Sequence, residues 1–330
     1  MHKLSDLSEK YKSEGYLPFN IKGKKRVNLL ALGDVGGMLL TGLKLLGSDV
    51  ISEIGICDIN ENVAMRYEME MNQIVFPFEP EKLPDVKMVK PEALFDCDVF
   101  VFCASKGVPE VGTEVRDVRM IQFEGNKAIV EQYARLAAEK KFKGLFAIVS
   151  DPVDPLCKAA YLASNREEQG HYHWNGLCAQ QFQGYGLGVM NSRAIYFAKK
   201  EERYKQYLKE GRAFGPHGED LVIANSIEHY NQELSDELTK LTVESNRVTR
   251  QLGFKPYIAP ALSSGAISIL LTMRGDWHYS SNYIGFQTEG AFMGALNRMT
   301  KEGLEWEDLN LPESLFYRIK RAYDRLQDII

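Results

Sequence analysis

A glycine turn near the N-terminus and an aspartate further along carry the clearest chemical signal in this chain. The apolar run Val27–Leu32 leads into Gly33-Asp34-Val35-Gly36, and an apolar helical stretch follows. Asp58 closes the next apolar run, 25 residues after Gly33. A strand, a glycine turn and a helix N-terminus can bind a pyrophosphate, and an acid after the next strand can accept hydrogen bonds from a ribose hydroxyl. The pattern is typical of proteins that bind a dinucleotide.

One position of this turn departs from the usual G-x-G-x-x-G spacing. Ala31 stands where the first glycine is expected, so Gly33 and Gly36 remain. A partial glycine motif also occurs at ordinary strand–turn–helix corners, but the β-α-β pattern around it and the acid at Asp58 favour a cofactor site. Because a 2′-phosphate would meet the negative charge of Asp58, we expect NAD rather than NADP.

Strands alternate with helices in the first half of the chain and must position these residues. Strand-like runs lie at about 26–32, 53–58, 98–103 and 144–150, with helical patterns at about 36–47, 60–72 and 115–139. This alternation predicts an α/β fold with a Rossmann-type doubly wound parallel sheet. Beyond it, 164–185 reads as a polar loop, and charged helices are expected at about 189–210, 218–252 and 312–330. We predict an N-terminal arm (1–24), an NAD-binding domain (25–152) and an α+β substrate domain (153–330).

The composition places limits on location and partners. The chain has 330 residues, of which 45% are apolar and 26% charged, with a net charge of −5. Mild acidity argues against nucleic acid as a partner. No apolar run approaches the ~20 residues that cross a bilayer, and the polar segment Met1–Lys25 lacks the apolar core of a secretory signal. Five scattered cysteines favour reduced thiols. We therefore expect a cytoplasmic protein that binds neither membranes nor nucleic acids.

Further motifs follow in order along the chain and carry a family resemblance. Val149–Asp154 reads V-S-D-P-V-D, Ala104–Pro109 is similar to the start of a mobile substrate loop, and the helix start Gly186–Arg193 and the segment Gly215–Asp220 complete the series. With the glycine turn, they resemble the V-S-N-P-V-D, G-x-V-L-D-x-x-R and G-x-H-G-[DE] motifs of the lactate/malate dehydrogenase superfamily. The resemblance covers about residues 25 to 330.

The resemblance implies hydride transfer between NAD and a 2-hydroxy or 2-oxo acid, a small-molecule carboxylate, in a homodimer or homotetramer. It assigns His217 as the proton carrier and Arg193, 24 residues earlier, as the anchor of the substrate carboxylate. Histidine suits proton transfer near neutral pH, and arginine binds carboxylates bidentately. Either residue could instead be solvated on the surface. The cofactor-binding residues that the resemblance implies are Gly33, Asp34, Val35, Gly36, Asp58, Ile59, Ala104, Ser105, Asn126 and Ser150, and no metal is expected.

A mobile-loop arginine is harder to place, because the loop carries about three extra residues relative to the family pattern. Alignment forward from Gly107-Val108-Pro109 indicates Arg116, whereas alignment backward from Asn126 and Asp151 indicates Arg119. A second cation over the substrate carbonyl would stabilise developing charge. Both arginines could also lie on a solvated helix face.

Two substitutions change the part of the pattern that performs the chemistry. Asp151 replaces the asparagine of N-P-V-D, and an ionised carboxylate cannot donate a hydrogen bond to a substrate oxygen. Met190 replaces the aspartate that orients the catalytic histidine. Asn191 could take over that role if the register slips by one residue, or Asp151 could supply the missing negative charge from another direction. We therefore include Asp151 among the catalytic candidates of an atypical active site.

A third departure concerns the position of the mobile loop that recognises the side group of the substrate. Forward alignment puts Glu110 where malate-specific members carry an arginine, and an acid there would repel malate and suit a neutral or cationic substituent. The residue could also be a solvated loop glutamate. An amine near Asp151 or Glu110, with a carboxylate on Arg193, would indicate an amino-bearing acid as the ligand.

Two other classes of function stay open. Gly176-Leu177-Cys178 faintly resembles a motif of NAD- and metal-dependent glycoside hydrolases, with Cys178 and His217 as candidate ligands. The spacing of His171, His173 and Cys178 matches no standard zinc site, so a polar surface insertion is favoured there. Loss of the asparagine and aspartate at 151 and 190 also motivates a non-catalytic NAD-binding protein.

Overall fold

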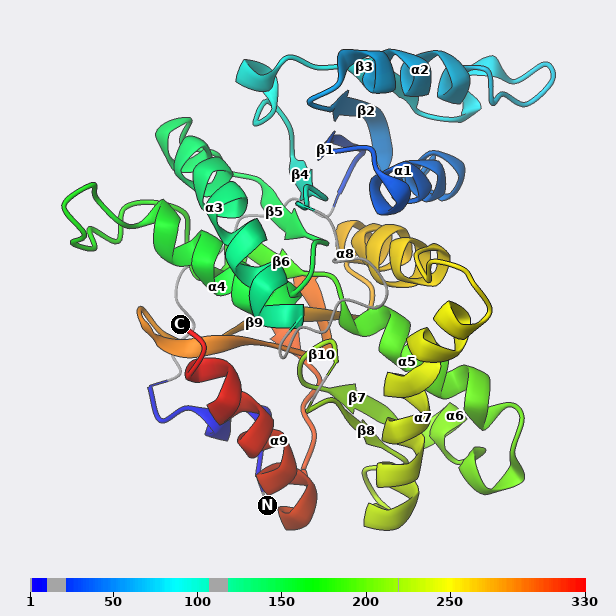
Figure 1. The fold of residues 1–330 in the computed structure, drawn as a ribbon, viewed down its shortest axis with the longest axis vertical. Coiled ribbons are helices and arrows are strands. Elements are labelled where there is room, and N and C mark those ends of the chain that lie inside the picture. Colours follow the sequence, from blue (N-terminus) through cyan, green and yellow to red (C-terminus); the bar gives the residue numbers. More distant parts are fainter. Residues whose placement is uncertain (1, 11–21, 107–117, 219) are drawn as a thin grey trace.

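One mixed β-sheet forms the centre of the computed structural model, which describes residues 2–10, 22–106, 118–218 and 220–330. Its nine strands lie in the order β11-β10-β9-β6-β5-β4-β1-β2-β3, and those from β6 to β3 pair in parallel (Figure 1). In chain order the strands of this sheet are β1 (Lys25–Leu30), β2 (Ile51–Cys57), β3 (Asp85–Met88), β4 (Val99–Phe102), β5 (Leu145–Ile148), β6 (Phe182–Gly184), β9 (His278–Phe286), β10 (Glu289–Thr300) and β11 (Gly303–Trp306). Strands β9, β10 and β11 are antiparallel to their neighbours.

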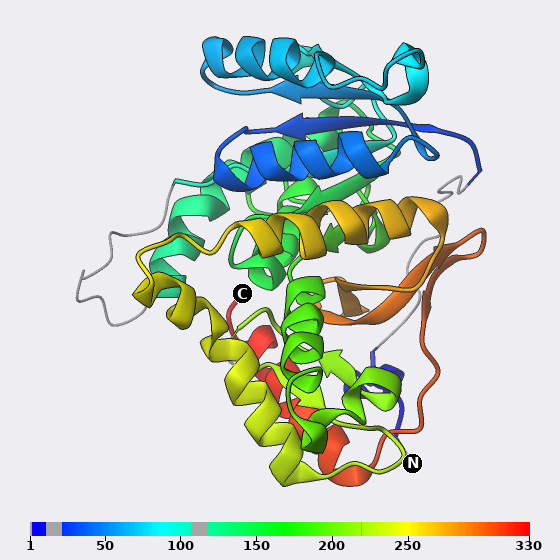
Figure 2. The same cartoon turned by 90° about the vertical axis from the view of Figure 1, so that its right-hand side faces the viewer.

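Helices cover both faces of the sheet (Figures 1 and 2). The first face carries α1 (Asp34–Leu46), α2 (Glu61–Asn72) and α8 (Ser268–Arg274) with the π-helix η6 (Pro260–Ile267) before it, and the second carries α3 (Val118–Glu139) and α4 (Val153–Ser164). Alternate residues of β4 point to opposite faces of the sheet, because side chains alternate along a strand. Val99 and Val101 pack with the first helical layer, whereas Phe100 and Phe102 pack with the second.

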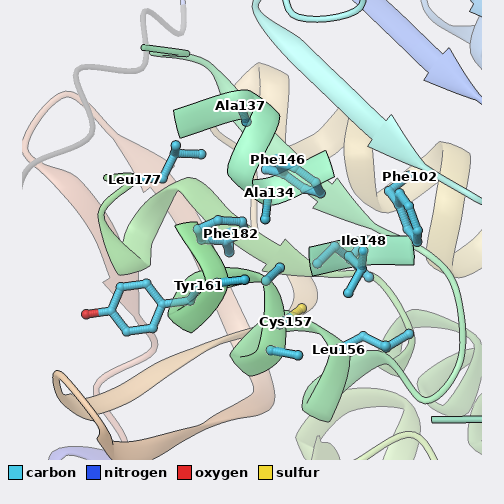
Figure 3. Packing of buried hydrophobic residues seen from close by; sticks show 14 of the residues in the cluster. Phe102, Ala134, Ala137, Phe146, Ile148, Leu156, Cys157, Tyr161, Leu177 and Phe182 are labelled. Carbon is cyan, nitrogen blue, oxygen red and sulfur yellow. The ribbon is translucent and has the colours of Figure 1, made fainter. Parts of the chain in front are cut away.

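The second core is rich in aromatic rings. Phe146 of β5 lies 4.8 Å from Phe100 and 5.2 Å from Phe182, measured between ring centroids, and Tyr161 of α4 closes the cluster (Figure 3). Each such side chain contributes roughly 1.5–3 kcal/mol when it is fully buried. This packing fixes the end of β5 against the start of α4, the segment that contains Asp151 and Asp154.

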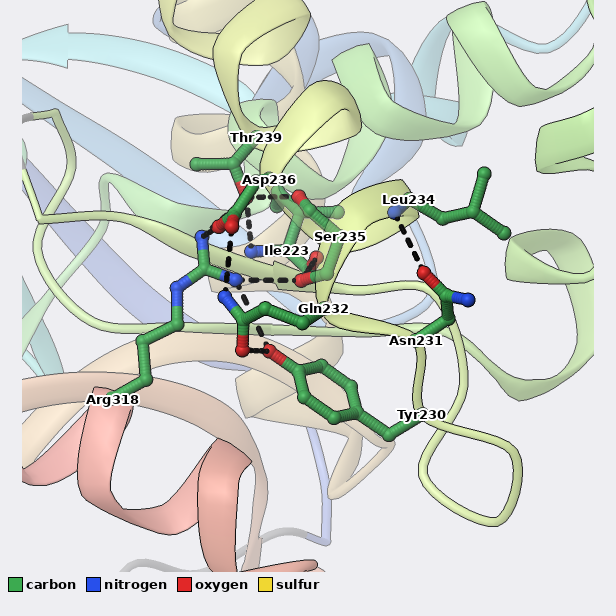
Figure 4. A network of polar contacts seen from close by, with 9 residues as sticks. All are labelled: Ile223, Tyr230, Asn231, Gln232, Leu234, Ser235, Asp236, Thr239 and Arg318. Carbon is green, nitrogen blue, oxygen red and sulfur yellow. Dashed lines mark hydrogen bonds and ion pairs between the residues drawn. The ribbon is translucent and has the colours of Figure 1, made fainter.

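The second half of the chain adds a two-stranded sheet and four further helices. These elements are β7 (Arg212–Phe214), β8 (Val222–Ala224), α5 (Leu187–Ala198), α6 (Tyr207–Glu210), α7 (Gln232–Gln251) and α9 (Glu313–Gln327). Arg318 of α9 ties this region together: it donates to Ser235 and Thr239 of α7 and pairs with Asp236 at 2.9 Å (Figure 4). Short 3-10 helices occupy η1 (Leu4–Leu7), η2 (Pro80–Lys82), η3 (Pro91–Ala93), η4 (Ala179–Gln181) and η5 (Glu202–Tyr204).

Most predicted elements of the first half are confirmed. The four strand-like runs correspond to β1, β2, β4 and β5, and the helical patterns correspond to α1, α2 and the described part of 115–139. The parallel sheet with helices on both faces confirms the predicted fold class. The described part of the arm forms η1, and His2 stacks on Phe316 at 4.2 Å. Within the described residues, no helix is long and apolar enough to cross a membrane.

Two helices of the second half were predicted wrongly as continuous segments. The pattern at 189–210 breaks after Ala198, because the chain turns back to bury Tyr204 and Tyr207 against α5. The pattern at 218–252 contains strand β8, and its helix starts only at Gln232. Asn231 caps that helix by accepting from the backbone N–H of Leu234 at 3.0 Å.

The sequence also missed several elements, among them α4 and the hairpin of β9 and β10. Strand β6 continues the parallel order from β5, and the antiparallel strands extend the same sheet. The sheet therefore runs across residue 152 without a break, and the division into 25–152 and 153–330 stays a prediction.

Candidate active site

The turn between β1 and α1 brings its small residues into close contact. Ala31 has a φ of +74°, in the left-handed region that favours glycine, at a cost of roughly 1–2 kcal/mol for a residue with a Cβ. A Cβ on Gly36 would lie 2.0 Å from the carbonyl oxygen of Ala31. Only glycine at position 36 therefore allows α1 to approach β1 this closely.

The N-terminus of α1 borders open space. The helix starts at Asp34 with Gly33 as its N-cap, and a Cβ on Gly33 would meet no atom within 4 Å. The first N–H groups of a helix lack intrahelical partners and attract anions. Val35 packs against the first core, and the exposed Asp34 pairs with Lys255 at 3.1 Å. Of the predicted turn residues, Gly33 is the one placed where a phosphate could approach.

A cavity of about 790 Å³ opens where β1, β2, β3 and β4 end. Four predicted cofactor residues line it, namely Asp58, Ile59, Ala104 and Ser105, whereas Gly33 to Gly36 do not. Apolar side chains such as Val89, Ile129 and Tyr133 form much of the rest of the wall. In parallel α/β sheets, ligands bind at the carboxyl ends of the strands. The cavity therefore lies at the expected place for the adenosine half of a dinucleotide.

Asp58 is held in place by the backbone beside it. Its Oδ2 accepts from the N–H of Leu32 at 2.7 Å, and its Oδ1 accepts from the N–H of Asn60 at 2.9 Å. Each carboxylate oxygen has two lone pairs, so the group can accept further hydrogen bonds from a pair of ligand hydroxyls. These contacts fit a ribose at the mouth of the cavity.

Ser150 and Asn126 link the cavity residue Ala104 and its neighbour Lys106 to Asp151. The buried Ser150 hydroxyl donates to the carbonyl of Ala104 at 2.8 Å. The buried Asn126 donates to the carbonyl of Asp151 at 2.8 Å and accepts from the N–H of Lys106 at 2.9 Å. Both predicted cofactor residues therefore join the ends of β4 and β5, and they set the position of Asp151.

His217 and Asp151 form a pair, 66 residues apart in sequence. Nδ1 of His217 lies 3.0 Å from Oδ1 of Asp151, and the peptide bond between Asp151 and Pro152 is cis. The side chain of His217 is 12% exposed and that of Asp151 is 50% exposed. Nε2 of His217 is buried without a hydrogen-bond partner among the described residues. The carboxylate is thus the more accessible half of the pair.

Two neighbours fix the position of His217. Its backbone N–H donates to Oδ2 of the buried Asp154 at 3.3 Å, and a Cβ on Gly186 would lie 2.8 Å from its Cβ. Asp154 also accepts from the hydroxyl of Ser281 at 2.5 Å. Burial raises the pKa of Asp154 to about 6, although both hydrogen bonds favour the ionised form.

Arg193 is buried on α5, and its charge interacts with that of Asp151. Burial lowers the pKa of Arg193 to about 10, and the negative charge of Asp151 opposes this shift. Its guanidinium donates to Asn246 of α7 and, at 3.4 Å, to the sulfur of Met190. The charge of Arg193 is therefore influenced by Asp151, the residue that pairs with His217.

The structure decides between the alternatives for the lost aspartate. Met190 is buried in an apolar cluster formed by the second half of the chain. Asn191 accepts from the hydroxyl of Tyr207 at 2.8 Å, so its side-chain oxygen is engaged away from the ring. The negative charge beside His217 comes instead from Asp151. The backbone of Arg119 lies in the first turn of α3, while its side chain, Arg116 and Glu110 lie outside the described residues.

No candidate metal centre is present in the described part of the chain. Nowhere in it do three or more His, Cys, Asp or Glu side chains gather closely enough to bind an ion. In the insertion, Nδ1 of His173 accepts from the N–H of Asn175 at 2.9 Å, and Tyr172 stacks on Trp174. The hydrolase alternative, which needs Cys178 and His217 at one metal, gains no support from this arrangement.

Three residues of the site were not predicted from the sequence: Asp154, Asn246 and Ser281. Asp154 lies inside V-S-D-P-V-D and could have been found from that motif. Asn246 lies in the charged helix α7 and Ser281 in the buried strand β9, neither of which carries a motif, so only the packing of α7 and β9 reveals them.

Comparison with known proteins agrees with this architecture. The L-lactate dehydrogenase of Treponema denticola is 31% identical over 204 residues, which is 62% of this chain and 58% of that protein. The L-lactate dehydrogenase of Mesomycoplasma hyopneumoniae is 25% identical over 233 residues, covering 69% of this chain and 67% of the relative. The chain thus spans less than two thirds of the length of the Treponema relative. No family model matches the chain.

Solved structures show the same fold. The minor L-lactate dehydrogenase of Enterococcus mundtii has a TM-score of 0.73 at 17% identity, covering 94% of this chain and 99% of its own. The malate dehydrogenase of Archaeoglobus fulgidus, solved in complex with NADH, has a TM-score of 0.72 at 15% identity, covering 92% and 97%. The chain is thus similar in sequence to L-lactate dehydrogenases and has the fold of the lactate and malate dehydrogenases. Against the motifs of that family, its glycine turn is nearly intact, whereas positions 151 and 190 are changed.

Proposed function

We propose that the chain is an NAD-dependent oxidoreductase that transfers a hydride between NAD(H) and C2 of a small carboxylic acid, the reaction that its relatives perform on 2-hydroxy and 2-oxo acids. One observation carries this proposal. Asp151, the partner of His217, directly follows Ser150, whose hydroxyl donates to the carbonyl of Ala104 in the wall of the cavity. In this proposal the pair therefore moves its proton beside a dinucleotide site.

In this proposal the cofactor is held mainly by backbone and small side chains. The N-terminus of α1 at Gly33 binds the pyrophosphate, and Asp58 accepts from the ribose hydroxyls. The apolar wall with Val89, Ile129 and Tyr133 takes the adenine. When bound, the nicotinamide accepts or supplies the hydride. NAD is preferred over NADP because a 2′-phosphate would lie against the carboxylate of Asp58.

The substrate residues act by charge and by proton transfer. Arg193 binds the substrate carboxylate, and its contact with Asn246 holds the guanidinium in a fixed orientation. The pair of His217 and Asp151 takes or gives the proton at the C2 substituent. In this proposal either Arg116 or Arg119 supplies a second cation that stabilises charge on the substrate carbonyl. Because Asp151 and Met190 replace the family's asparagine and aspartate, we expect slow turnover of pyruvate and oxaloacetate.

Assembly into a homodimer or homotetramer is also part of this proposal. Helix α2 exposes Met65 and Met69, whose exposed fractions are 55% and 60%, and Leu45 and Leu46 of α1 are also exposed. Exposed apolar groups of this kind are common at protein interfaces. Light scattering coupled to size-exclusion chromatography should give a mass of two or four times 37.4 kDa. A monomeric mass at micromolar concentration would contradict the assembly.

The experiment that tests the proposed function has two steps. Titration of NADH followed by its fluorescence measures cofactor binding, and absorbance at the NADH band then measures turnover with a panel of 2-oxo acids. We expect NADH to bind more tightly than NADPH and turnover to fall strongly in His217→Gln. Absence of NADH binding contradicts the whole proposal. Binding without turnover on any C2 substrate favours a non-catalytic NAD-binding protein instead.

A further inference from the structure

The backbone of His217 is held on one side by a buried carboxylate that a distant strand supports. The N–H of His217 donates to Oδ2 of Asp154 at 3.3 Å, and the hydroxyl of Ser281 donates to Oδ1 of the same side chain at 2.5 Å. Asp154 lies in the first turn of α4 and Ser281 in β9, and both are buried. The position of His217 therefore depends on a serine that lies in another strand of the main sheet.

Gly186, at the start of α5, closes the other side of His217. A Cβ on Gly186 would lie 2.8 Å from the Cβ of His217 and 3.2 Å from its Cγ. The carbonyl of Gly186 accepts from the hydroxyl of Ser264 at 2.7 Å, and the same hydroxyl oxygen accepts from the N–H of Val189 at 2.8 Å. Ser264 is buried in η6, and π-helical turns are frequent at functional sites. A second serine thus fixes the backbone that touches the histidine.

These contacts determine where the imidazole ring of His217 can exchange a proton. Nδ1 lies 3.0 Å from Oδ1 of Asp151, which leaves Nε2 as the other ring atom that can carry a proton. Nε2 has no hydrogen-bond partner among the described residues. Because a methionine occupies position 190, the orientation of the ring depends on where the backbone of His217 is held.

We propose that Ser281 and Ser264 are positioning residues for His217, the first acting through Asp154 and the second through Gly186. This inference rests on the proposed function, in which His217 takes or gives the proton at the C2 substituent. Proton transfer needs the two heavy atoms within hydrogen-bond reach, and a misplacement of about 1 Å can lower a rate about 100-fold. Each serine therefore affects turnover through the position of the ring.

The contacts of Asp154 matter more than its charge in this arrangement. The carboxylate meets the backbone N–H of His217, whereas the negative charge that meets the ring belongs to Asp151. An asparagine at 154 would accept that N–H through its oxygen and donate to the Ser281 oxygen through its NH₂ group. Asp154→Asn should therefore lose less activity than Asp154→Ala, which removes both contacts.

The test compares Ser281→Ala and Ser264→Ala with the wild type by two independent measurements. In steady-state assays with the best 2-oxo acid of the panel, kcat should fall about tenfold or more, while KM and NADH affinity stay within about threefold. In NMR spectra, the ring nitrogen signals of His217, assigned by their loss in His217→Gln, should shift in both variants. Gly186→Ala should shift the same signals, because its Cβ displaces the histidine from the other side.

Ser164→Ala is the matched control. This buried serine lies at the other end of α4 and donates to the carbonyl of Tyr161 at 2.8 Å, so its loss should leave kcat and the His217 signals unchanged. A role in stability alone would lower the unfolding temperature of all three serine variants and leave both readouts at their wild-type values.

The contrary outcomes separate this inference from the proposed function. If NADH does not bind, or the wild type turns over no C2 substrate, the proposed function fails, and the ring signals still report whether the serines position His217. Unchanged ring signals in Ser281→Ala and Ser264→Ala would overturn the inference, as would an unchanged kcat in both variants of an active enzyme. The two serines act from different segments, so poor folding of one variant leaves the other to decide.

Discussion

In the proposed site, the part that binds the cofactor and the part that binds the substrate are formed by different kinds of contact. At the nucleotide turn, the contacts come from backbone N–H groups and from one acid, Asp58, within a short stretch of chain. At the proposed substrate group, two contacts join side chains from distant segments, namely Asp151 with His217 and Arg193 with Asn246. A backbone site tolerates changes in side chains, whereas a side-chain site changes its chemistry when one residue is replaced.

This difference explains where the chain has diverged from its relatives. Ala31 is tolerated at a glycine position, with its φ of +74°, because the turn still delivers α1 to the same place. At position 151 an amide became a carboxylate, and the new group pairs with His217 and interacts with Arg193.

Removal of Arg193 should have the largest effect and should leave the cofactor half untouched. Arg193→Met takes away the carboxylate anchor, so we expect kcat/KM for the best substrate of the panel to fall about 1,000-fold or more, since charge-assisted bidentate contacts are strong. NADH affinity should not change. Arg203→Met, at an exposed arginine paired with Glu201 and Glu237, is the matched control. Equal losses of NADH binding and turnover would contradict the separation of the two halves.

The buried carboxyl of Asp154 should make the free energy of unfolding depend on pH. Its pKa is raised to about 6 in the folded protein, so it is protonated in both states at low pH and ionised in both states above pH 6. Folding then carries the cost of burying the charge, and the free energy of unfolding should decrease by about 2 kcal/mol as pH rises from 4 to 7. Asp154→Asn removes this component. Urea unfolding of both proteins at the two pH values measures it.

The direction in which stability changes with pH tests this effect of Asp154. The stability of the wild type relative to Asp154→Asn should be greatest at pH 4 and smallest at pH 7. A difference that is constant over this range would show that burial does not raise the pKa of Asp154. Asp308→Asn, at an exposed position, should track the wild type at both pH values.

Two glycines of the turn should respond differently to the same added methyl group. In Gly36→Ala the new Cβ would collide with the carbonyl of Ala31, and the free energy of unfolding should fall by about 1–3 kcal/mol. In Gly33→Ala the Cβ enters open space at a negative φ, so the fold is retained and NADH affinity falls about tenfold because the pyrophosphate loses room. Thermal unfolding and NADH titration compare the two. A stable Gly36→Ala would contradict the contact.

Asp58 should control the choice of cofactor with the smallest effect. Asp58→Asn removes the negative charge and keeps one acceptor, so NADH affinity should weaken by a few fold to about tenfold, and NADPH affinity should rise. The ratio of the two dissociation constants is the measurement. An unchanged ratio would mean that the ribose does not contact Asp58.

The sequence predicted the elements whose pattern is local. Strands β1, β2, β4 and β5 are short apolar runs with helices between them, and such patterns are readable because both faces of the sheet are buried. The strand β8 and the break after Ala198 could not be read, because tertiary burial of Tyr204 and Tyr207 overrides helical periodicity there. The antiparallel strands β9 to β11 pair over a long range and carry no turn signal that places them in the sheet.

The sequence by itself determined that a glycine turn and Asp58 stand at the ends of neighbouring strands, because that arrangement follows from chain order and backbone geometry. It also determined that a donor was lost at 151 and a carboxylate at 190. Only the tertiary structure decided that Asp151 pairs with His217, that Asn191 turns to Tyr207, and that Nε2 of the histidine is buried. These contacts join segments far apart in the chain, and only packing fixes the distance and burial of such side chains.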